Sequence, residues 1–157
     1  MEDKALLSTE VASGAEKAEL LIVIPAYNEA ENIERVVNHL TANFPQYDYV
    51  VVNDGSRDET AAICQRNGYN LLNLPVNLGL AGAFQAGLKY ADKYGYQYAV
   101  QLDGDGQHRP EYLESMIKKM EEGYDIVIGS RFVGEKKPFT MRMLGSNLIE
   151  MAIRFTT

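Results

Sequence analysis

Short apolar runs alternate with longer amphipathic stretches along the chain from residue 20 onward. The apolar runs consist mainly of aliphatic and aromatic residues, and most of them lack alternating polar positions. This pattern is typical of strands that are buried on both faces of a parallel sheet. We therefore expect five strands, at residues 20–25, 49–53, 69–74, 98–102 and 125–128.

The stretches between the apolar runs predict helices, because their apolar residues recur at helical spacing. Ile33, Val37 and Leu40, for example, fall on one face of a helix. The predicted helices cover residues 29–43, 58–67, 80–94 and 111–122.

Several of these helices carry local start signals. Asn28 with Glu31, and Ser56 with Glu59, have the spacing of capping boxes, in which a side-chain oxygen and a returning carboxylate satisfy the first free backbone amides. Pro110 suits the first turn of the last helix, where a missing N–H costs nothing. The signals support a regular alternation of strands and helices.

Such an alternation implies right-handed crossovers and an open, mainly parallel sheet with helices on both faces. The expected fold class is therefore α/β, a three-layer α/β/α, Rossmann-like arrangement. Ligands of such sheets bind beyond the carboxyl ends of the strands. The polar turns at these ends, which we expect to share one edge of the sheet, are residues 26–29, 54–58, 77–82 and 103–108.

The composition supports one folded domain. The chain has 157 residues, of which 46% are hydrophobic and 24% charged, close to the average for soluble globular proteins. Residues 1–19 are polar and weakly patterned, so we expect a mobile tail there and one domain over residues 20–157. The net charge of -7 argues against nucleic acid as a partner, because clustered Lys and Arg hold phosphate backbones.

The rest of the composition bears on cysteine chemistry and location. Cys64 is the single cysteine, which excludes an internal disulfide, and its place in a helical pattern predicts a small buried residue. The sequence shows no N-terminal signal pattern and no apolar run of about 18 to 20 residues, the length that crosses a bilayer. We therefore expect the protein in the cytoplasm.

The turn after the fourth predicted strand offers metal chemistry. Asp103 and Asp105 flank a glycine, so both carboxylates can point at one cation, and Gln107 adds an amide oxygen. Mg²⁺ and Mn²⁺ prefer such oxygen ligands. Because Asp-Gly-Asp-Gly is also ordinary turn chemistry, the motif gains weight only from its neighbours.

Further turns offer groups to a ligand. Asp58 can cap the second helix and leave the Asp54 carboxylate to accept hydrogen bonds from a ligand's N–H or hydroxyl. Arg131, after the fifth predicted strand, has planar donors that suit a diphosphate, with a salt bridge to a carboxylate of the acidic turn as the alternative. His108 is close enough to the acidic turn to stay a candidate.

Together these segments resemble glycosyltransferase family 2, the inverting glycosyltransferases with the GT-A nucleotide-sugar fold. They are most similar to its branch of dolichol-phosphate mannose synthases and polyprenyl-phosphate glycosyltransferases. The match covers most of the chain, in the family's order and spacing. It comprises residues 24–29, 52–60, 77–87, 102–108 and 129–132.

The resemblance implies a nucleoside site. Pro25, Tyr27, Glu29 and Asp54 are expected to surround the nucleoside, and Asp54 is the candidate to bind the base.

The resemblance also implies a metal and diphosphate site. Asp103 is expected to reach the ribose or the metal, Asp105 and Gln107 to ligate Mg²⁺ or Mn²⁺, and Arg131 to face the phosphates. A cation there neutralises charge that develops on the departing nucleoside diphosphate.

The last part of the chain departs from the family pattern. In the branch it resembles, an Asp-bearing Ser-Gly-aromatic motif completes the acceptor side, and nothing here matches that motif. The catalytic base is therefore expected outside this chain, and no catalytic residue is assigned. Residues 141–155 are apolar nearly all round. We expect them to pack against a further part of the domain, with an interfacial membrane helix as the alternative, and to cause self-association when exposed.

The expected activity is transfer of a sugar from a UDP- or GDP-linked donor to a polyprenyl phosphate or a cell-envelope saccharide. The chain then acts in the cytoplasm or at the inner face of the cell membrane. The alternative is a nucleotide-sugar-binding fragment or regulatory module without turnover. Nucleotidyl transfer to a sugar phosphate is disfavoured, because no basic residue precedes Arg35 in the first turn to hold a triphosphate.

Overall fold

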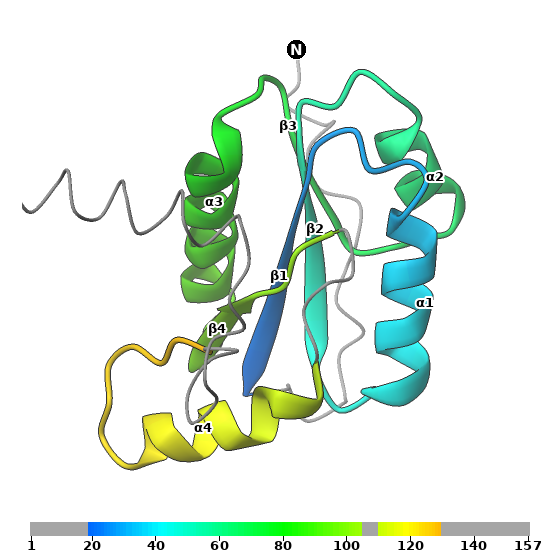
Figure 1. Cartoon of the computed structure of the whole chain (residues 1–157). Coiled ribbons are helices and arrows are strands. Elements are labelled where there is room, and N and C mark those ends of the chain that lie inside the picture. Colours follow the sequence, from blue (N-terminus) through cyan, green and yellow to red (C-terminus); the bar gives the residue numbers. More distant parts are fainter. Residues whose placement is uncertain (1–18, 105–109, 130–157) are drawn as a thin grey trace, which may run out of the picture. The chain divides into compact units, whose positions relative to one another are not determined.

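The computed structural model describes residues 19–104 and 110–129 (Figure 1). These residues form a parallel sheet with helices on both of its faces. Within these ranges no helix is long and apolar enough to cross a membrane. The strands are β1 (Leu20–Ala26), β2 (Asp48–Asp54), β3 (Leu71–Leu74) and β4 (Tyr98–Gln101), and the helices are α1 (Ile33–Asn43), α2 (Thr60–Arg66), α3 (Gly79–Lys93), the 3-10 turn η1 (Pro110–Tyr112) and α4 (Leu113–Glu121).

The sheet has the strand order β3-β2-β1-β4, and every pair is parallel. β1 is central, because residues 21–26 pair with 48–53 of β2 and residues 20–23 pair with 98–101 of β4. The chain order reverses between β1 and β4, and open α/β sheets bind ligands at such a switch point. The predicted α/β class with a mainly parallel sheet is confirmed.

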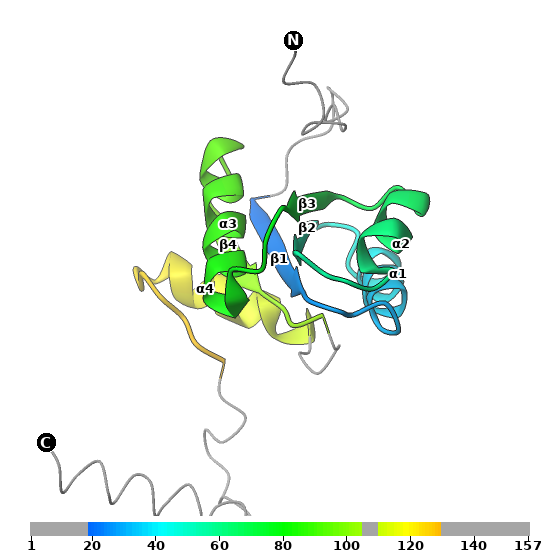
Figure 2. The same cartoon turned by 90° about the horizontal axis from the view of Figure 1, so that it is seen from above.

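The two faces of β1 are buried under different helices. Leu20, Ile22 and Ile24 pack in a core cluster with residues of α1, α2 and the first turn of α4. Leu21 and Val23 pack in a second cluster with residues of α3. α1 and α2 accordingly lie on one side of the sheet and α3 on the other (Figure 1 and Figure 2). This two-sided burial explains the unbroken apolar run of the strand.

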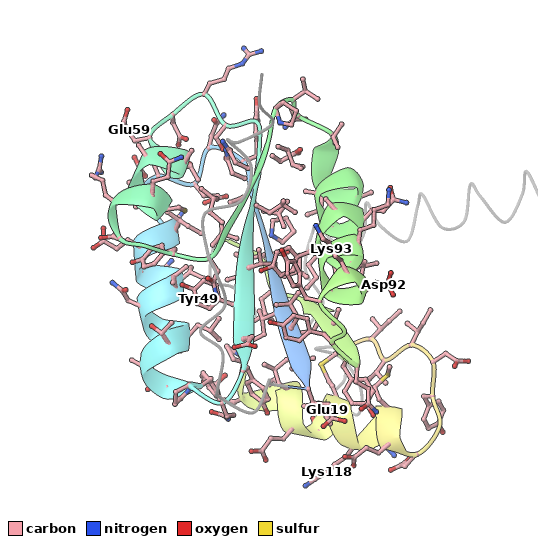
Figure 3. All side chains as sticks on the ribbon, turned by 180° about the vertical axis from the view of Figure 1, so that it is seen from behind. Glu19, Tyr49, Glu59, Asp92, Lys93 and Lys118 are labelled. Carbon is pink, nitrogen blue, oxygen red and sulfur yellow. The ribbon has the colours of Figure 1, made fainter. Side chains whose placement is uncertain are left out.

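α3 packs unusually close to β1 at one position. A Cβ built on Gly87 of α3 would lie 2.2 Å from Cγ1 of Val23, so α3 approaches β1 closely only because this residue has no side chain. On the other face, the large side chain of Tyr49 lies between the sheet and α1 (Figure 3). Burial raises the pKa of the Tyr49 hydroxyl.

Cys64 of α2 is fully buried in the core on the α1 side of the sheet. Burial raises the pKa of its thiol to about 11, because an apolar environment disfavours the thiolate. The prediction of a small buried residue is confirmed.

Two predicted elements differ from the structure by more than two residues at an end. α1 begins at Ile33 rather than at residue 29; residues 30–32 form a turn, and the N–H groups of Glu29 and Ala30 donate to Thr60 and Asp58 of the neighbouring loop. The predicted strand at 125–128 is wrong: these residues are not in a strand, and Ile126 and Ile128 are 79% and 84% exposed. A strand requires a neighbouring edge to pair with, and the described part of the chain pairs no strand with this segment.

The chain divides into two compact units between Ile117 and Lys118. The described part of the first unit contains the sheet and α1 to α3. In the second, Lys119 forms an ion pair with Glu122, with 2.7 Å between Nζ and Oε2. The tail at 1–19 lies outside the described residues except for Glu19, and the assignment of one domain to 20–157 stays a prediction.

Candidate functional site

The carboxyl ends of the strands lie at one edge of the sheet. Ala26 pairs with Asn53, and Asp54 pairs with Leu74, so β1, β2 and β3 end at the same level. After β4 the N–H of Leu102 donates to the carbonyl of Val23 (3.0 Å) and extends the chain toward this level. Of the predicted polar turns, residues 26–29, 54–58, 77–78 and 103–104 therefore share one edge, and residues 79–82 form the first turn of α3.

The turn after β1 is joined to the turn after β2 through Asn28. The backbone N–H of Asn28 donates to Oγ of Ser56 (3.0 Å), and Oδ1 of Asn28 accepts from the backbone N–H of Arg57 (2.9 Å). Asn28 is thus not the cap of α1, whose N-cap is Asn32 and has no side-chain cap hydrogen bond. The two predicted capping boxes are wrong, because Asn28 and Ser56 use their polar groups across the loops instead.

A second connection between these turns runs through Asp58 and Thr60. The N–H of Glu29 donates to Oγ1 of Thr60 (2.9 Å), and that of Ala30 donates to Oδ2 of Asp58 (3.1 Å). Oδ1 of Asp58 accepts from the N–H of Thr60 (3.0 Å) at the start of α2; the N-cap of α2 is Glu59, so Asp58 binds the first amide of the helix from the position before the cap. Although burial raises the pKa of this carboxyl, hydrogen bonds from Thr60 and Ala30 outweigh burial and hold it below its ordinary value.

Asp54 joins the turn after β2 to the start of α3. Its side chain is 2% exposed, and Oδ1 accepts from the N–H of Leu78 at 2.7 Å. The carbonyl of Asp54 also accepts from Nδ2 of Asn77 (3.1 Å). We expected this carboxylate to be left for a ligand, but one of its oxygens serves the protein's own backbone.

Gly55 brings these two loops into contact. Its φ is +63, and a Cβ there would lie 2.7 Å from the backbone N of Asn77 and the backbone C of Val76. Both the left-handed conformation and the close approach require glycine.

The turn after β4 lies against the end of β1. Asp103 is half-buried, and its Oδ1 accepts from Nε2 of Gln101 (2.9 Å). A Cβ on the buried Gly104 would lie 3.1 Å from the carbonyl oxygen of Pro25 and 3.5 Å from Cγ of Glu29. The carboxylate of Glu29 itself accepts from Nδ2 of Asn32 (2.9 Å). Pro25, Glu29 and Asp103 are thereby brought to the same part of the edge.

The other predicted nucleoside residue, Tyr27, follows β1 and is 43% exposed. Asp105, Gln107, His108 and Arg131 lie outside the described residues, as does the apolar segment 141–155. Within the described ranges no three His, Cys, Asp or Glu side chains are grouped as a metal site. The metal and phosphate ligands therefore stay predictions.

Asn53 contributes to this edge although its role was not predicted. It is 3% exposed at the end of β2; its Nδ2 donates to Oδ1 of Asn73 (2.6 Å), and its Oδ1 accepts from the N–H of Ser56 (3.3 Å). A buried amide must have such partners. An asparagine inside an otherwise apolar strand, one residue before the turn, was the available signal.

The site so described belongs to a parallel α/β sheet with its polar groups at the carboxyl edge. Residues 21–156 match the model of the family "Glycosyl transferase family 2". The chain belongs to this family.

Relatives with known names share part of their sequence with the chain. It is 34% identical over 119 residues to polyprenol monophosphomannose synthase of Mycolicibacterium smegmatis, covering 72% of this chain and 45% of the relative. It is also 34% identical over 119 residues to undecaprenyl-phosphate mannosyltransferase of Micrococcus luteus, covering 73% and 49%. The chain thus spans about half the length of the curated relatives it matches.

Solved structures share the fold. The mannosyltransferase PcManGT from Pyrobaculum calidifontis, in complex with GDP-Man and Mn2+, has a TM-score of 0.53 and 21% identity over 66% of this chain and 32% of that protein, a likeness in fold alone. S. aureus TarS 1-349 in complex with UDP-GlcNAc has a TM-score of 0.52 and 26% identity over 78% of this chain and 37% of that protein. Both are similar to the α/β sheet described above.

Proposed function

We propose that this chain binds a nucleotide diphosphate sugar with a divalent cation and forms the donor side of an inverting glycosyltransferase. The observation that carries the proposal is the meeting of the turns that contain Tyr27, Asp54 and Asp103 at the carboxyl edge of a family 2 sheet. Relatives named for mannosyl transfer to polyprenyl phosphates support a lipid phosphate as acceptor, with a cell-envelope saccharide as the alternative. A lipid acceptor places the reaction at the inner face of the cell membrane.

The nucleoside is assigned to the turns after β1 and β2. Pro25, Tyr27 and Glu29 would lie along one side of it, and Asp54 would accept an N–H of the base. Of the two Asp54 oxygens, Oδ1 is bonded to Leu78, and no described residue donates a hydrogen bond to Oδ2. We therefore assign the base to Oδ2.

The metal is assigned to Asp103, Asp105 and Gln107, and the diphosphate to Arg131. Carboxylate and amide oxygens fit Mg²⁺ or Mn²⁺, and Asp103 stands where β4 ends, close to the nucleoside turns. When bound, the cation supplies positive charge to the leaving nucleoside diphosphate. The chain's own residues bind and orient the donor, which lowers the barrier by fixing the reacting geometry.

Titration of the protein with UDP and GDP, with and without Mn²⁺, tests this proposal, followed by a hydrolysis assay with the matching sugar nucleotides. We expect binding of at least one diphosphate that strengthens with Mn²⁺. The absence of metal-dependent binding of either nucleotide would contradict the proposal. Binding without turnover would support a donor-binding module.

The metal assignment is tested by Asp105→Ala, which should remove the effect of Mn²⁺ on nucleotide affinity and leave the fold intact. Asp92→Ala is the matched control, because Asp92 is an exposed carboxylate near the end of α3 (Figure 3). The assignment fails if Asp105→Ala keeps the Mn²⁺ dependence of the wild type.

A further inference from the structure

Asn28 has an unusual backbone at the centre of the proposed nucleoside site. Within the described ranges it is the one non-glycine residue with a positive φ, at 56. This conformation is strained for a residue with a Cβ, although Asn tolerates it better than most. Strained backbone conformations persist where neighbouring residues hold them in place, and they are frequent at binding sites.

Asn28 forms hydrogen bonds with two successive residues of the loop after β2. Its N–H donates to Oγ of Ser56, and its Oδ1 accepts from the N–H of Arg57. Both the backbone and the side chain of one residue are therefore used to bind the turn after β2. Any rotation of Asn28 toward ordinary helical geometry would move these two groups apart.

The connection continues into the sheet. The N–H of Ser56 donates to Oδ1 of the buried Asn53, and Nδ2 of Asn53 donates to Asn73 next to β2. The loop that Asn28 contacts is thus itself held by β2 and β3. Ser56 therefore connects the loop after β1 to the sheet through hydrogen bonds.

Asn28 lies between Tyr27 and Glu29, and the residues that it binds follow Asp54 by two and three positions. We infer that Asn28 is a positioning residue that joins the loops 27–30 and 54–58 into one unit, so that Tyr27 and Glu29 are fixed relative to Asp54 before the nucleoside arrives. This inference rests on the proposed nucleotide site. Pre-ordering of this kind raises affinity because less freedom is lost on binding.

Three variants isolate the role. Asn28→Gly keeps access to the left-handed backbone but removes the acceptor, whereas Asn28→Asp keeps a short side chain with an acceptor oxygen. Asn67→Gly makes the same change at an exposed position that follows α2, away from the carboxyl edge. The affinity for UDP and GDP is measured with Mn²⁺, together with the urea midpoint of each variant.

We expect Asn28→Gly to weaken nucleotide binding about 10-fold, the effect of losing one well-made hydrogen bond and the order it imposes. Asn28→Asp should stay within about 3-fold of the wild type, and Asn67→Gly should not change the affinity. A purely structural role would shift the urea midpoint and leave the affinity of the folded protein unchanged. Wild-type affinity in Asn28→Gly would therefore overturn the inference.

Amide hydrogen exchange without nucleotide separates this inference from the proposed function. We expect the N–H of Arg57 to exchange about 10-fold faster in Asn28→Gly than in the wild type and near the wild-type rate in Asn28→Asp. Unchanged exchange at Arg57 in Asn28→Gly would overturn the coupling of the loops, whatever the nucleotide data show. If the wild type binds no nucleotide but the exchange rate rises as expected, the proposed function fails and the coupling stands.

Discussion

The side chain of Asp54 and the backbone of Leu78 are joined by a hydrogen bond of 2.7 Å between Oδ1 and N. The bond links the end of β2 to the residue that precedes α3. The Asp54 carboxylate thus binds the backbone of Leu78 and is proposed to bind the base of the nucleotide. Substitutions of Asp54 can separate these two roles.

Asp54→Asn keeps an acceptor for Leu78 and removes the negative charge. We expect it to lower the affinity for nucleotide by about 10-fold or more, the weight of a hydrogen bond to a charged group, while the free energy of unfolding changes little. Asp54→Ala should also lower the free energy of unfolding, by about 1–3 kcal/mol, because the N–H of Leu78 loses its acceptor. Calorimetric titration and urea unfolding measure the two effects. Wild-type affinity in Asp54→Asn would remove Asp54 from the proposed base site.

Gly87→Ala should destabilise the protein, because the new Cβ would lie 2.2 Å from Cγ1 of Val23. We expect a loss of about 1–3 kcal/mol from overpacking, which exceeds the gain of about 1 kcal/mol in helix propensity. Urea unfolding measures the change. Gln85→Ala, at an exposed position of the same helix, should stay within about 0.5 kcal/mol of the wild type. Val23→Ala in the Gly87→Ala background should recover part of the loss, and no recovery would contradict the proposed clash.

Cys64 should react very slowly with a thiol reagent such as DTNB in the folded protein. With burial raising the pKa of its thiol to about 11, only about 0.1% is thiolate at pH 8, and the thiolate is the reactive form. Reaction should become fast and stoichiometric in urea, and Cys64→Ser provides the blank. Rapid labelling of the native protein at pH 8 would show that the thiol is accessible.

Asp58 should contribute to stability in a pH-dependent way. Its folded pKa lies below the ordinary value because hydrogen bonds from Thr60 and Ala30 outweigh the opposing effect of burial. A depressed folded pKa means that the stabilising effect is fully present above the unfolded pKa of about 3.9 and is lost as the pH falls through the folded pKa. Asp58→Ala removes the acceptor of the N–H groups of Ala30 and Thr60, and this loss should cost about 1 kcal/mol at pH 7.

The difference between Asp58→Ala and the wild type should shrink as the pH falls below about 4, where the wild-type carboxyl takes up its proton. Urea unfolding at pH 7 and at pH 3 measures this change. The neighbouring exposed Glu59, whose pair with Arg66 spans 3.6 Å, provides the control: Glu59→Ala should be nearly neutral at both values of pH. If the difference in free energy of unfolding between Asp58→Ala and the wild type were the same at pH 7 and pH 3, the stabilising role of the Asp58 carboxylate would be contradicted.

The central strand was predictable from the sequence because both of its faces are buried. β1 shows an unbroken apolar run, and its observed bounds, Leu20–Ala26, differ from the predicted 20–25 by one residue. Residues 125–128 have a similar composition but pair with no described strand. Composition reports how apolar a segment is, whereas strand formation depends on a partner elsewhere in the chain.

The candidate site was predictable only in part, for a related reason. Parallel topology places the ends of the strands at one edge, so the grouping of the turns followed from the order of elements. How the turns are joined did not follow. Asn28 and Arg57 are far apart in sequence, as are Asp54 and Leu78, and no local pattern indicates either hydrogen bond.

The central position of β1 affects how the protein is made. β1 can pair with β2 once both have been synthesised, but its other edge is completed only when Tyr98–Gln101 has been synthesised. Until then an apolar strand presents unpaired backbone groups, a state prone to association with other chains. The order of synthesis therefore leaves the central strand of the sheet with one free edge until the last strand of the sheet, β4, has been made.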